Sequence, residues 1–153
     1  MRVAHYFAYG SNMNPARVRE RGLRVRAIRG GRVAGFDLAF DKRSADHACG
    51  HANLVHRAGA VAEGVLYELH GVDEILRMDP FERAPVNYSR EVVTVETATG
   101  TVAAWTYFAN VAVRRDGMRP DRAYLDHLLR GRPWLSEGWY ARLAAWPTAD
   151  GAP

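Results

Sequence analysis

The sequence of 153 residues is long enough for one domain with a buried core, and its 48% hydrophobic and 25% charged residues are typical of a globular protein. Its apolar runs fall short of the roughly 18 residues that span a membrane, it shows no N-terminal secretion signal, and its one cysteine, Cys49, excludes an internal disulfide. We therefore expect a cytoplasmic protein without a membrane partner, with a single domain at residues 1–147 and a tail at 148–153.

The first predicted strand, at residues 3–8, ends in a short polar loop. Gly10-Ser11-Asn12 follows the strand directly, and these residue types tolerate unusual backbone angles and expose their N–H groups. Asn14 is placed as the N-cap of a helix and Pro15 as its first residue. Such a loop presents several N–H donors in one direction, which suits a carboxylate or an oxyanion. An ordinary strand-to-helix turn is the alternative interpretation.

The predicted helix at residues 14–20 ends at Gly22 and begins an arginine-rich stretch. The net charge is +4, and every basic residue but Lys42 is arginine. No stacking aromatic residues are interleaved with the cluster, so it favours a solvated surface over a nucleic-acid partner. The lone Lys42 leaves little room for a lysine-based mechanism. The clustered residues are Arg17, Arg19, Arg21, Arg24, Arg26, Arg29 and Arg32.

The next segments are predicted to be extended. Residues 24–40 read as two extended pieces that are broken at Gly30-Gly31, and the second piece alternates with a period of two. Two more strands are expected at residues 51–56 and 60–69, around a turn at Ala58-Gly59.

A short helix is predicted at residues 72–79, with Asp73 as its N-cap. Pro80 is expected to close or redirect this helix. Glu82 then lies just beyond its end.

The last third of the chain combines a hairpin with two helices. Strands at residues 88–97 and 101–110 are expected to form the hairpin. One helix is expected to run to Arg130 and stop at Gly131, and Ser136 is expected to cap the other. Beyond them, the tail is expected to fray. Strands dominate the middle and helices the end, which indicates an α+β fold rather than a βαβ alternation.

A histidine-rich segment raises the question of a metal. His47, Cys49 and His51 lie two residues apart, with His56 nearby. Residues two apart share one face of a strand, but this set matches no standard ligand spacing and falls in a segment that reads as a loop. We therefore expect no metal.

Ser11 and Glu82 are the candidate reactive side chains. Ser11 lacks the outer glycines of a Gly-x-Ser-x-Gly nucleophile elbow, so a serine hydrolase is not favoured. Glu82 lies in a stiff, partly apolar segment between Pro80 and Pro85, where desolvation would raise its pKa toward the range useful for proton transfer. A surface ion pair with Arg83 or Arg77 is the alternative.

The loop and the acid together resemble the γ-glutamylcyclotransferase family, with its AIG2-like members. The stretch Tyr6-Phe7-Ala8-Tyr9-Gly10-Ser11-Asn12-Met13 is similar to the family's N-terminal signature, and Met78-Asp79-Pro80-Phe81-Glu82 to the motif that carries its catalytic glutamate. Further landmarks fall in the family's order along residues 3–146. These are Val33-Ala34-Gly35-Phe36-Asp37-Leu38-Ala39-Phe40, Asn53-Leu54-Val55, Glu63-Gly64-Val65-Leu66-Tyr67, Tyr88-Ser89-Arg90 and Trp105-Thr106-Tyr107.

The resemblance implies a small mixed β-barrel with flanking helices that acts on a small-molecule γ-glutamyl substrate. The substrate's own α-amine would attack its γ-amide carbonyl, giving 5-oxoproline and a free amine, with no cofactor and with Glu82 as general acid and base. By the family match, the substrate-binding positions are Tyr9, Gly10, Ser11, Asn12, Met13, Tyr88, Tyr107 and Tyr124, and Arg90 is a further candidate contact.

One departure from the family leaves the substrate open. The family often has glycine after the glutamate, where this chain has Arg83. A cation there could lower the pKa of Glu82 or contact a substrate carboxylate. Two alternatives therefore stay open, a hydrolase of γ-glutamyl amides and a non-catalytic binding module, in either case as a monomer or homodimer.

Overall fold

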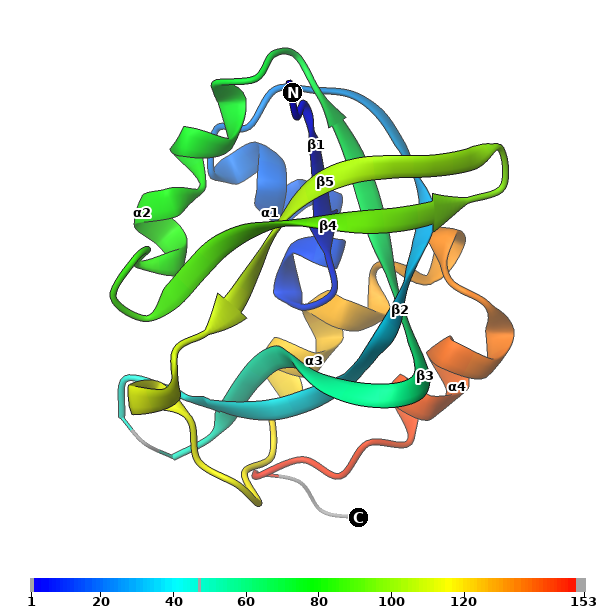
Figure 1. Ribbon diagram of the computed structural model, residues 1–153. Helices are drawn as coiled ribbons and strands as arrows, with labels where there is room; N and C mark the ends of the chain where they lie inside the picture. The colour runs from blue at the N-terminus through cyan, green and yellow to red at the C-terminus, as the bar shows by residue number, and fades with distance from the viewer. Residues whose placement is uncertain (1, 47, 151–153) are drawn as a thin grey trace.

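The computed structural model describes residues 2–46 and 48–150, and in them five strands close into one barrel (Figure 1). The predicted α+β fold, a small mixed barrel with flanking helices, is confirmed. The strands are β1 (His5–Ala8), β2 (Val25–Arg43), β3 (Gly50–Leu69), β4 (Tyr88–Thr97) and β5 (Gly100–Ala109). The helices are α1 (Pro15–Glu20), α2 (Asp79–Glu82), α3 (Arg122–Leu129) and α4 (Glu137–Ala144), and short 3-10 turns span Ser11–Met13, Glu74–Arg77, Val111–Val113 and Arg132–Trp134.

Two antiparallel hairpins and one short strand make the barrel. The strand order is β1-β3-β2-β4-β5, with β2 paired to β3 and β4 paired to β5. Strand β1 is antiparallel to β3 and parallel to β5, with Tyr6 opposite Trp105, so the barrel is mixed. The single pair Arg32–Glu96 joins β2 to β4 and completes the circle. Strand β1 ends at Ala8, opposite Val65 of β3, and Gly10 in the loop after it packs against Ala52 near the start of β3.

The predicted breaks in the two long strands are wrong. Strand β2 runs through Gly30-Gly31 because these glycines serve close packing: a Cβ on Gly30 would lie 2.4 Å from the carbonyl oxygen of Trp134, and one on Gly31 would lie 2.4 Å from a methyl carbon of Val95. Strand β3 likewise runs through Gly59, whose φ of +82° falls where the β2–β3 register shifts. The shift is a bulge that bends the hairpin around the barrel rather than ending it.

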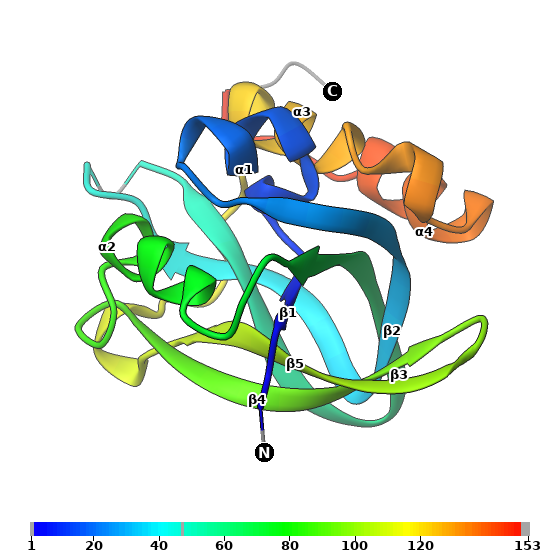
Figure 2. The same ribbon diagram turned by 90° about the horizontal axis from the view of Figure 1, so that it is seen from above.

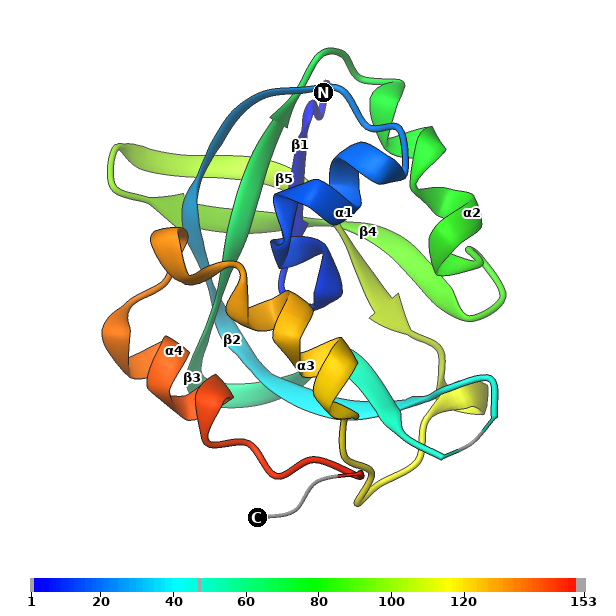
Figure 3. The same cartoon turned by 180° about the vertical axis from the view of Figure 1, so that it is seen from behind.

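Helices α1, α3 and α4 lie together on one side of the barrel, opposite the β4–β5 hairpin (Figures 2 and 3). The predicted cap at Ser136 is confirmed, since its side chain accepts from the N–H of Trp139, and the side chain of Asp121 likewise accepts from the N–H of Tyr124 at the start of α3. The apolar faces of these helices are fully buried at Leu125, Leu128 and Leu143. No helix of the described residues is long and apolar enough to span a membrane.

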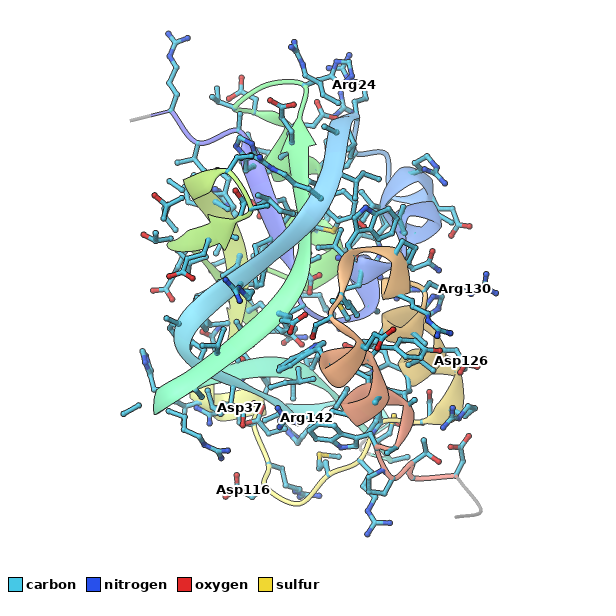
Figure 4. The ribbon with its side chains drawn as sticks, turned by 90° about the vertical axis from the view of Figure 1, so that its right-hand side faces the viewer. Arg24, Asp37, Asp116, Asp126, Arg130 and Arg142 are labelled. Atoms are coloured by element: carbon cyan, nitrogen blue, oxygen red, sulfur yellow. The ribbon has the colours of Figure 1, made fainter. Side chains whose placement is uncertain are left out.

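An ion-pair cluster fastens α4 to β2. Arg142 donates from Nη1 to Oδ1 of the buried Asp37 at 2.8 Å, and Arg57 donates to Oδ2 at 2.6 Å (Figure 4 labels Asp37 and Arg142). Burial alone would raise the pKa of Asp37, but the hydrogen bonds from Arg142 and from the Leu38 N–H hold that pKa below its usual range. Asp37 is therefore a structural anion.

The expected fraying of the C-terminal tail is wrong for residues 148–150. Thr148 is buried, and the N–H of Ala149 donates to the carbonyl of Pro120 at 2.8 Å. Asp150 accepts from the N–H of Arg122 at 3.0 Å, next to the start of α3. The rest of the predicted tail, 151–153, lies outside the described residues.

The segment that carries Glu82 differs from its prediction. One helix at 72–79 was expected to end at Pro80, but a 3-10 turn at Glu74–Arg77 is followed by α2, with Pro80 in the first turn of that helix. Proline suits this position because its missing N–H would have no partner there. Asp73 makes no side-chain cap; the buried Glu74 accepts from the N–H of Arg24 at 2.8 Å instead. Glu82 is therefore the last residue of a helix.

Candidate active site

A cavity of about 370 Å³ opens where the loop after β1 meets α1, α2, and the adjoining ends of β2 and β3. Of the nine site residues predicted from the sequence, eight line this cavity, and they come from five separate parts of the chain. The exception is Met13, which is fully buried and packs against Gly131, so it supports the loop from behind. The eight lining residues are Tyr9, Gly10, Ser11, Asn12, Glu82, Tyr88, Tyr107 and Tyr124.

Glu82 presents a largely enclosed carboxylate to the cavity. Its side chain is 17% exposed, and its Oε1 accepts a hydrogen bond from the amide of Asn12 at 3.1 Å. The nearest paired cation, Arg21, stands 3.8 Å from the same oxygen. Desolvation raises the pKa of Glu82 above its ordinary value, against the opposing charges of Arg21, Arg17 and Lys42. A carboxyl group with a raised pKa is suited to taking and returning a proton.

Asn12 has a role that the sequence did not reveal. Besides Glu82, its side-chain nitrogen donates to the hydroxyl of Tyr6 at 2.9 Å, and its side-chain oxygen accepts from Nη1 of Arg21 at 3.1 Å. Its carbonyl accepts from the hydroxyl of Tyr67 at 2.5 Å. The side chain is thus fixed on both sides, and it holds the Glu82 carboxylate in place.

The loop after β1 folds as a tight 3-10 turn, and several of its N–H groups have no acceptor among the described residues. The N–H of Met13 donates to the carbonyl of Gly10, and the N–H of Asn14 donates to that of Ser11. Among the described residues, none accepts from the N–H groups of Gly10-Ser11-Asn12. Only glycine fits at position 10, because a Cβ there would lie 2.9 Å from the Cβ of Ala52. Free N–H groups beside a cavity can hold a carboxylate or an oxyanion.

The four predicted tyrosines divide into two kinds. Three donate their hydroxyl protons to the protein: Tyr9 to the carbonyl of Tyr107, Tyr88 to the carbonyl of Ala52 at 2.9 Å, and Tyr107 to Oδ1 of Asp79 at 2.6 Å. Tyr124 instead accepts from the N–H of Ala52 at 2.9 Å. The side chain of Ser11 is also within hydrogen-bonding reach of this hydroxyl, and among the described residues no carbonyl or carboxylate accepts its proton.

The proton of Tyr124 stays on the hydroxyl throughout the neutral range. Burial raises the pKa of Tyr124 to about 12, even though the hydrogen bond from Ala52 lowers it. Tyr124 is therefore the member of the set best placed to donate to a ligand in the cavity.

Several lining residues were not identified from the sequence. Arg17 lies on α1, and Arg21, four residues on, is the C-cap of that helix, so helix periodicity after the signature loop could have placed them on one face. Lys42 and His51 pair across β2 and β3, and Tyr6 precedes the loop on β1. Finding Lys42 and His51 requires the strand register, which the sequence pattern does not give.

The predicted contact from Arg90 is not seen in the cavity. Its Nε pairs with Oδ1 of Asp79 at 2.9 Å, and its guanidinium lies over the ring of Trp105 at 4.4 Å. Asp79 also accepts from Tyr107, which does line the cavity. Arg90 thus braces the base of α2 from outside the cavity.

Arg83 occupies a backbone position that normally favours glycine. Its φ of 51° and ψ of 44° are left-handed, and its N–H closes the end of α2. This conformation explains in physical terms why a glycine is common after the glutamate in the family that the sequence resembles. Its side chain lines the cavity. The cations that act on the pKa of Glu82 are Arg21, Arg17 and Lys42 rather than Arg83.

The histidine-rich segment has other partners where the structure describes it. The ring of His51 stacks on Tyr124 at 4.4 Å, and burial, with the charge of Lys42, lowers the pKa of His51 to about 4. Cys49 is buried, with its Sγ 3.7 Å from Asp121. Within residues 2–46 and 48–150, no three His, Cys, Asp or Glu side chains gather as metal ligands, and His47 lies outside this part of the chain.

Comparison with known proteins places this chain in a family. The profile of the family described as γ-glutamyl cyclotransferase, AIG2-like matches residues 6–134. A search of curated proteins found no match. A solved structure named γ-glutamyl cyclotransferase is 20% identical, with a TM-score of 0.80 over 97% of this chain and 90% of that chain.

Two other solved structures have the same fold. An uncharacterized human protein is 22% identical, with a TM-score of 0.81 over 97% of this chain and 90% of that chain. A yeast γ-glutamyl cyclotransferase described as specific to glutathione is 12% identical, with a TM-score of 0.68 over 95% and 94%. These likenesses show a shared fold, and the family profile covers most of the chain. The chain belongs to the γ-glutamyl cyclotransferase, AIG2-like family.

Proposed function

We propose that this protein is a γ-glutamyl cyclotransferase that converts a small γ-glutamyl compound to 5-oxoproline and a free amine, with Glu82 as the proton-transfer residue. The observation that carries the proposal is the position of the Glu82 carboxylate, held by the Asn12 amide in a cavity beside the free N–H groups of Gly10-Ser11-Asn12. Family membership supports the same reaction class.

The proposed reaction is an acyl transfer within one molecule. The Glu82 carboxylate takes a proton from the substrate's α-ammonium, and the amine nitrogen then attacks the γ-carbonyl carbon. Negative charge develops on the carbonyl oxygen, where N–H donors of the loop can stabilise it. The bond to the leaving nitrogen breaks as Glu82 returns the proton to it. The ring nitrogen, which still carries two protons after the attack, loses one of them through Glu82 to the released amine. 5-Oxoproline and a protonated amine result, and atoms and charges balance without water.

The arrangement explains how so few reactive groups could suffice. The nucleophile and the carbonyl are already in one molecule, so the cavity has to fix a reactive conformer, and such orientation can lower a barrier by about 7–11 kcal/mol in the best cases. Proton transfer by a positioned carboxyl typically adds about 10²–10⁴-fold. Burial raises the pKa of Glu82 above its ordinary value, in the direction that suits a group that takes and returns a proton.

The test is to identify the product. Purified protein is incubated with a panel of γ-glutamyl amino acids and γ-glutamyl amines in H₂¹⁸O, and the products are analysed by mass spectrometry. We expect unlabelled 5-oxoproline with the free amine, and neither from the Glu82→Gln variant. Glutamate carrying ¹⁸O would instead establish hydrolysis. Tight binding of panel members without any product would identify a binding module and overturn the proposal.

A further inference from the structure

The cavity contains more positive charge than a γ-glutamyl group requires. Five basic side chains line it against one acidic residue, Glu82. His51 adds no charge near neutral pH, because its pKa is lowered to about 4. A γ-glutamyl group carries one ammonium and one carboxylate, so its own charges cancel. The surplus points to a second anionic group on the substrate. The five basic residues are Arg17, Arg21, Lys42, Arg43 and Arg83.

In the described part of the chain, Lys42 and Arg17 are enclosed cations of this set without a direct anionic partner, and Arg17, whose Nε is buried without a hydrogen bond, lies on α1 directly after the signature loop. Arg21 donates to Asn12 and stands beside Glu82, and Arg43 donates to the carbonyl of Ala112 at 3.1 Å. Lys42 is only 8% exposed, and within residues 2–46 and 48–150 no oxygen pairs with its ammonium. The ring of Tyr88 lies 5.9 Å from Nζ, and Glu82 acts on Lys42 through its charge without a direct ion pair. An enclosed ammonium without an anion is destabilising, and a bound carboxylate would relieve it.

The strand register places Lys42 away from the loop that would hold the glutamyl group. Lys42 pairs with His51 across β2 and β3. The next residue on β3, Ala52, is the one against which Gly10 packs. The loop therefore contacts β3, whereas Lys42 lies on the next strand, β2, and neighbouring strands are about 5 Å apart. A carboxylate on Lys42 would therefore belong to the other half of the substrate.

We propose that Lys42 is a specificity-determining residue that binds a carboxylate on the leaving half of the substrate. The enzyme would then act on γ-glutamyl amino acids or peptides in preference to γ-glutamyl derivatives of simple amines. This inference rests on the proposed cyclotransferase function. It also gives the lone lysine a role in recognition, apart from any lysine-based chemistry.

The test uses substrates that differ only in the charge of the leaving half. Several γ-glutamyl amino acids are compared with their carboxamides, for example γ-glutamyl-alanine with γ-glutamyl-alaninamide, and kcat/KM is measured for release of 5-oxoproline. We expect the acids to be favoured by roughly tenfold to a hundredfold, the range of a charge-assisted hydrogen bond. Lys42→Met should remove most of this preference, mainly through KM for the acids. Lys42→Arg should restore part of it.

Two controls separate recognition from folding and from general electrostatics. Lys42→Met should not lower the thermal unfolding midpoint, because an apolar side chain of similar length replaces an enclosed cation that lacks a partner. Arg26→Met removes one exposed positive charge on β2 outside the cavity and should leave the acid-to-amide ratio unchanged.

Each further outcome has a definite meaning. Equal kcat/KM for acids and amides in the wild-type enzyme would overturn the inference while leaving the cyclotransferase function in place. An equal loss for acids and amides in Lys42→Met would place Lys42 on the glutamyl half and would also overturn it. Absence of 5-oxoproline from every substrate would overturn the proposed function, and the inference with it.

Discussion

Asp37 and Glu82 are both enclosed carboxylates near arginines, but their pKa values are shifted in opposite directions. Asp37 is paired directly with Arg142 and Arg57 at 2.8 and 2.6 Å, and its pKa is held below the usual range. Glu82 receives a hydrogen bond from a neutral amide, and its closest arginine is 3.8 Å away, so desolvation prevails and its pKa is raised.

The comparison shows what distinguishes a structural anion from a proton-transfer group in this fold. Nearby positive charge alone does not decide the matter, since both carboxylates have it. Direct contact does, because an ion pair at hydrogen-bond distance stabilises the charged form more than burial disfavours it. Asp37 fastens α4 to β2, whereas Glu82 stays able to exchange a proton with a ligand in the cavity.

The largest expected effect is on turnover by Glu82→Gln. We expect kcat for 5-oxoproline release to fall about 10²–10⁴-fold, because glutamine keeps the shape but cannot accept the α-ammonium proton. The matched control is Asp37→Asn, assayed well below its unfolding midpoint, which should turn over near the wild-type rate. Near-normal turnover by Glu82→Gln would remove this residue from the mechanism.

The next effect comes from Asn12→Ala, which removes the hydrogen bond to Oε1 of Glu82. Loss of a hydrogen bond to a charged group predicts a fall in kcat of roughly tenfold to a hundredfold. Because this hydrogen bond lowers the pKa of Glu82, the acidic limb of the kcat/KM profile should move to higher pH. An unchanged limb would mean that Asn12 does not act through Glu82.

The free energy of unfolding should be lowered by Asp37→Asn and not by Glu82→Gln, the reverse of their expected effects on turnover. Asp37→Asn should lower the free energy of unfolding by about 1–3 kcal/mol, since two guanidinium groups lose their anion. Glu82→Gln should leave it unchanged or slightly higher at neutral pH, because the charged form of Glu82 is disfavoured in the folded state. Urea unfolding at pH 7 measures both variants, and equal losses would contradict the comparison.

The pH dependence of stability follows from the depressed pKa of Asp37. The stabilisation from Asp37 is fully present above its unfolded-state pKa and is lost as the pH falls through the lower folded-state value. The wild-type protein should therefore lose stability faster than Asp37→Asn as the pH drops below about 4, the ordinary range of an aspartate. Parallel curves for the two proteins would contradict this assignment.

The smallest effect is expected at Arg83, next to Glu82. Arg83→Gly should raise the free energy of unfolding by roughly 1 kcal/mol or less, because the left-handed backbone is costly for arginine and costless for glycine. Arg19→Gly, an exposed arginine within α1, is the matched control and should lower it by about 0.5–1 kcal/mol. Thermal unfolding compares the two, and a loss of stability in both would mean that the side chain of Arg83 makes the larger contribution.

Local sequence patterns predicted most of the helices and strands, and the wrong strand breaks depend on long-range contacts. The predicted caps at Asn14 and Ser136 depend on neighbours a few residues away and both are observed, whereas the predicted cap at Asp73 is not. The predicted strand breaks at Gly30-Gly31 and at Gly59 were wrong. Gly30 and Gly31 allow close packing against distant residues, and Gly59 lies at a bulge in the β2–β3 pairing. No pattern within either segment carries that information.

The same division holds for the site. Its signature loop and its acid could be picked out as motifs, and both border the cavity. The hydrogen bond from Asn12 to Glu82 joins residues 70 positions apart, and Lys42 reaches the cavity through its register with His51. Met13 follows the loop in sequence but turns into the core against Gly131. Motifs therefore located the site, whereas its charge pattern required the three-dimensional arrangement.

The most direct test of the account is the ionisation of Glu82 itself. Carboxyl-labelled glutamate allows each side chain to be titrated by ¹³C NMR, and the resonance missing from Glu82→Gln assigns the group. We predict a midpoint above the ordinary 4.5 for Glu82 and below 4.5 for Glu74, which hydrogen-bonds to Arg24. A Glu82 midpoint at or below 4.5 would make it an anion of the Asp37 kind and would contradict its role in proton transfer.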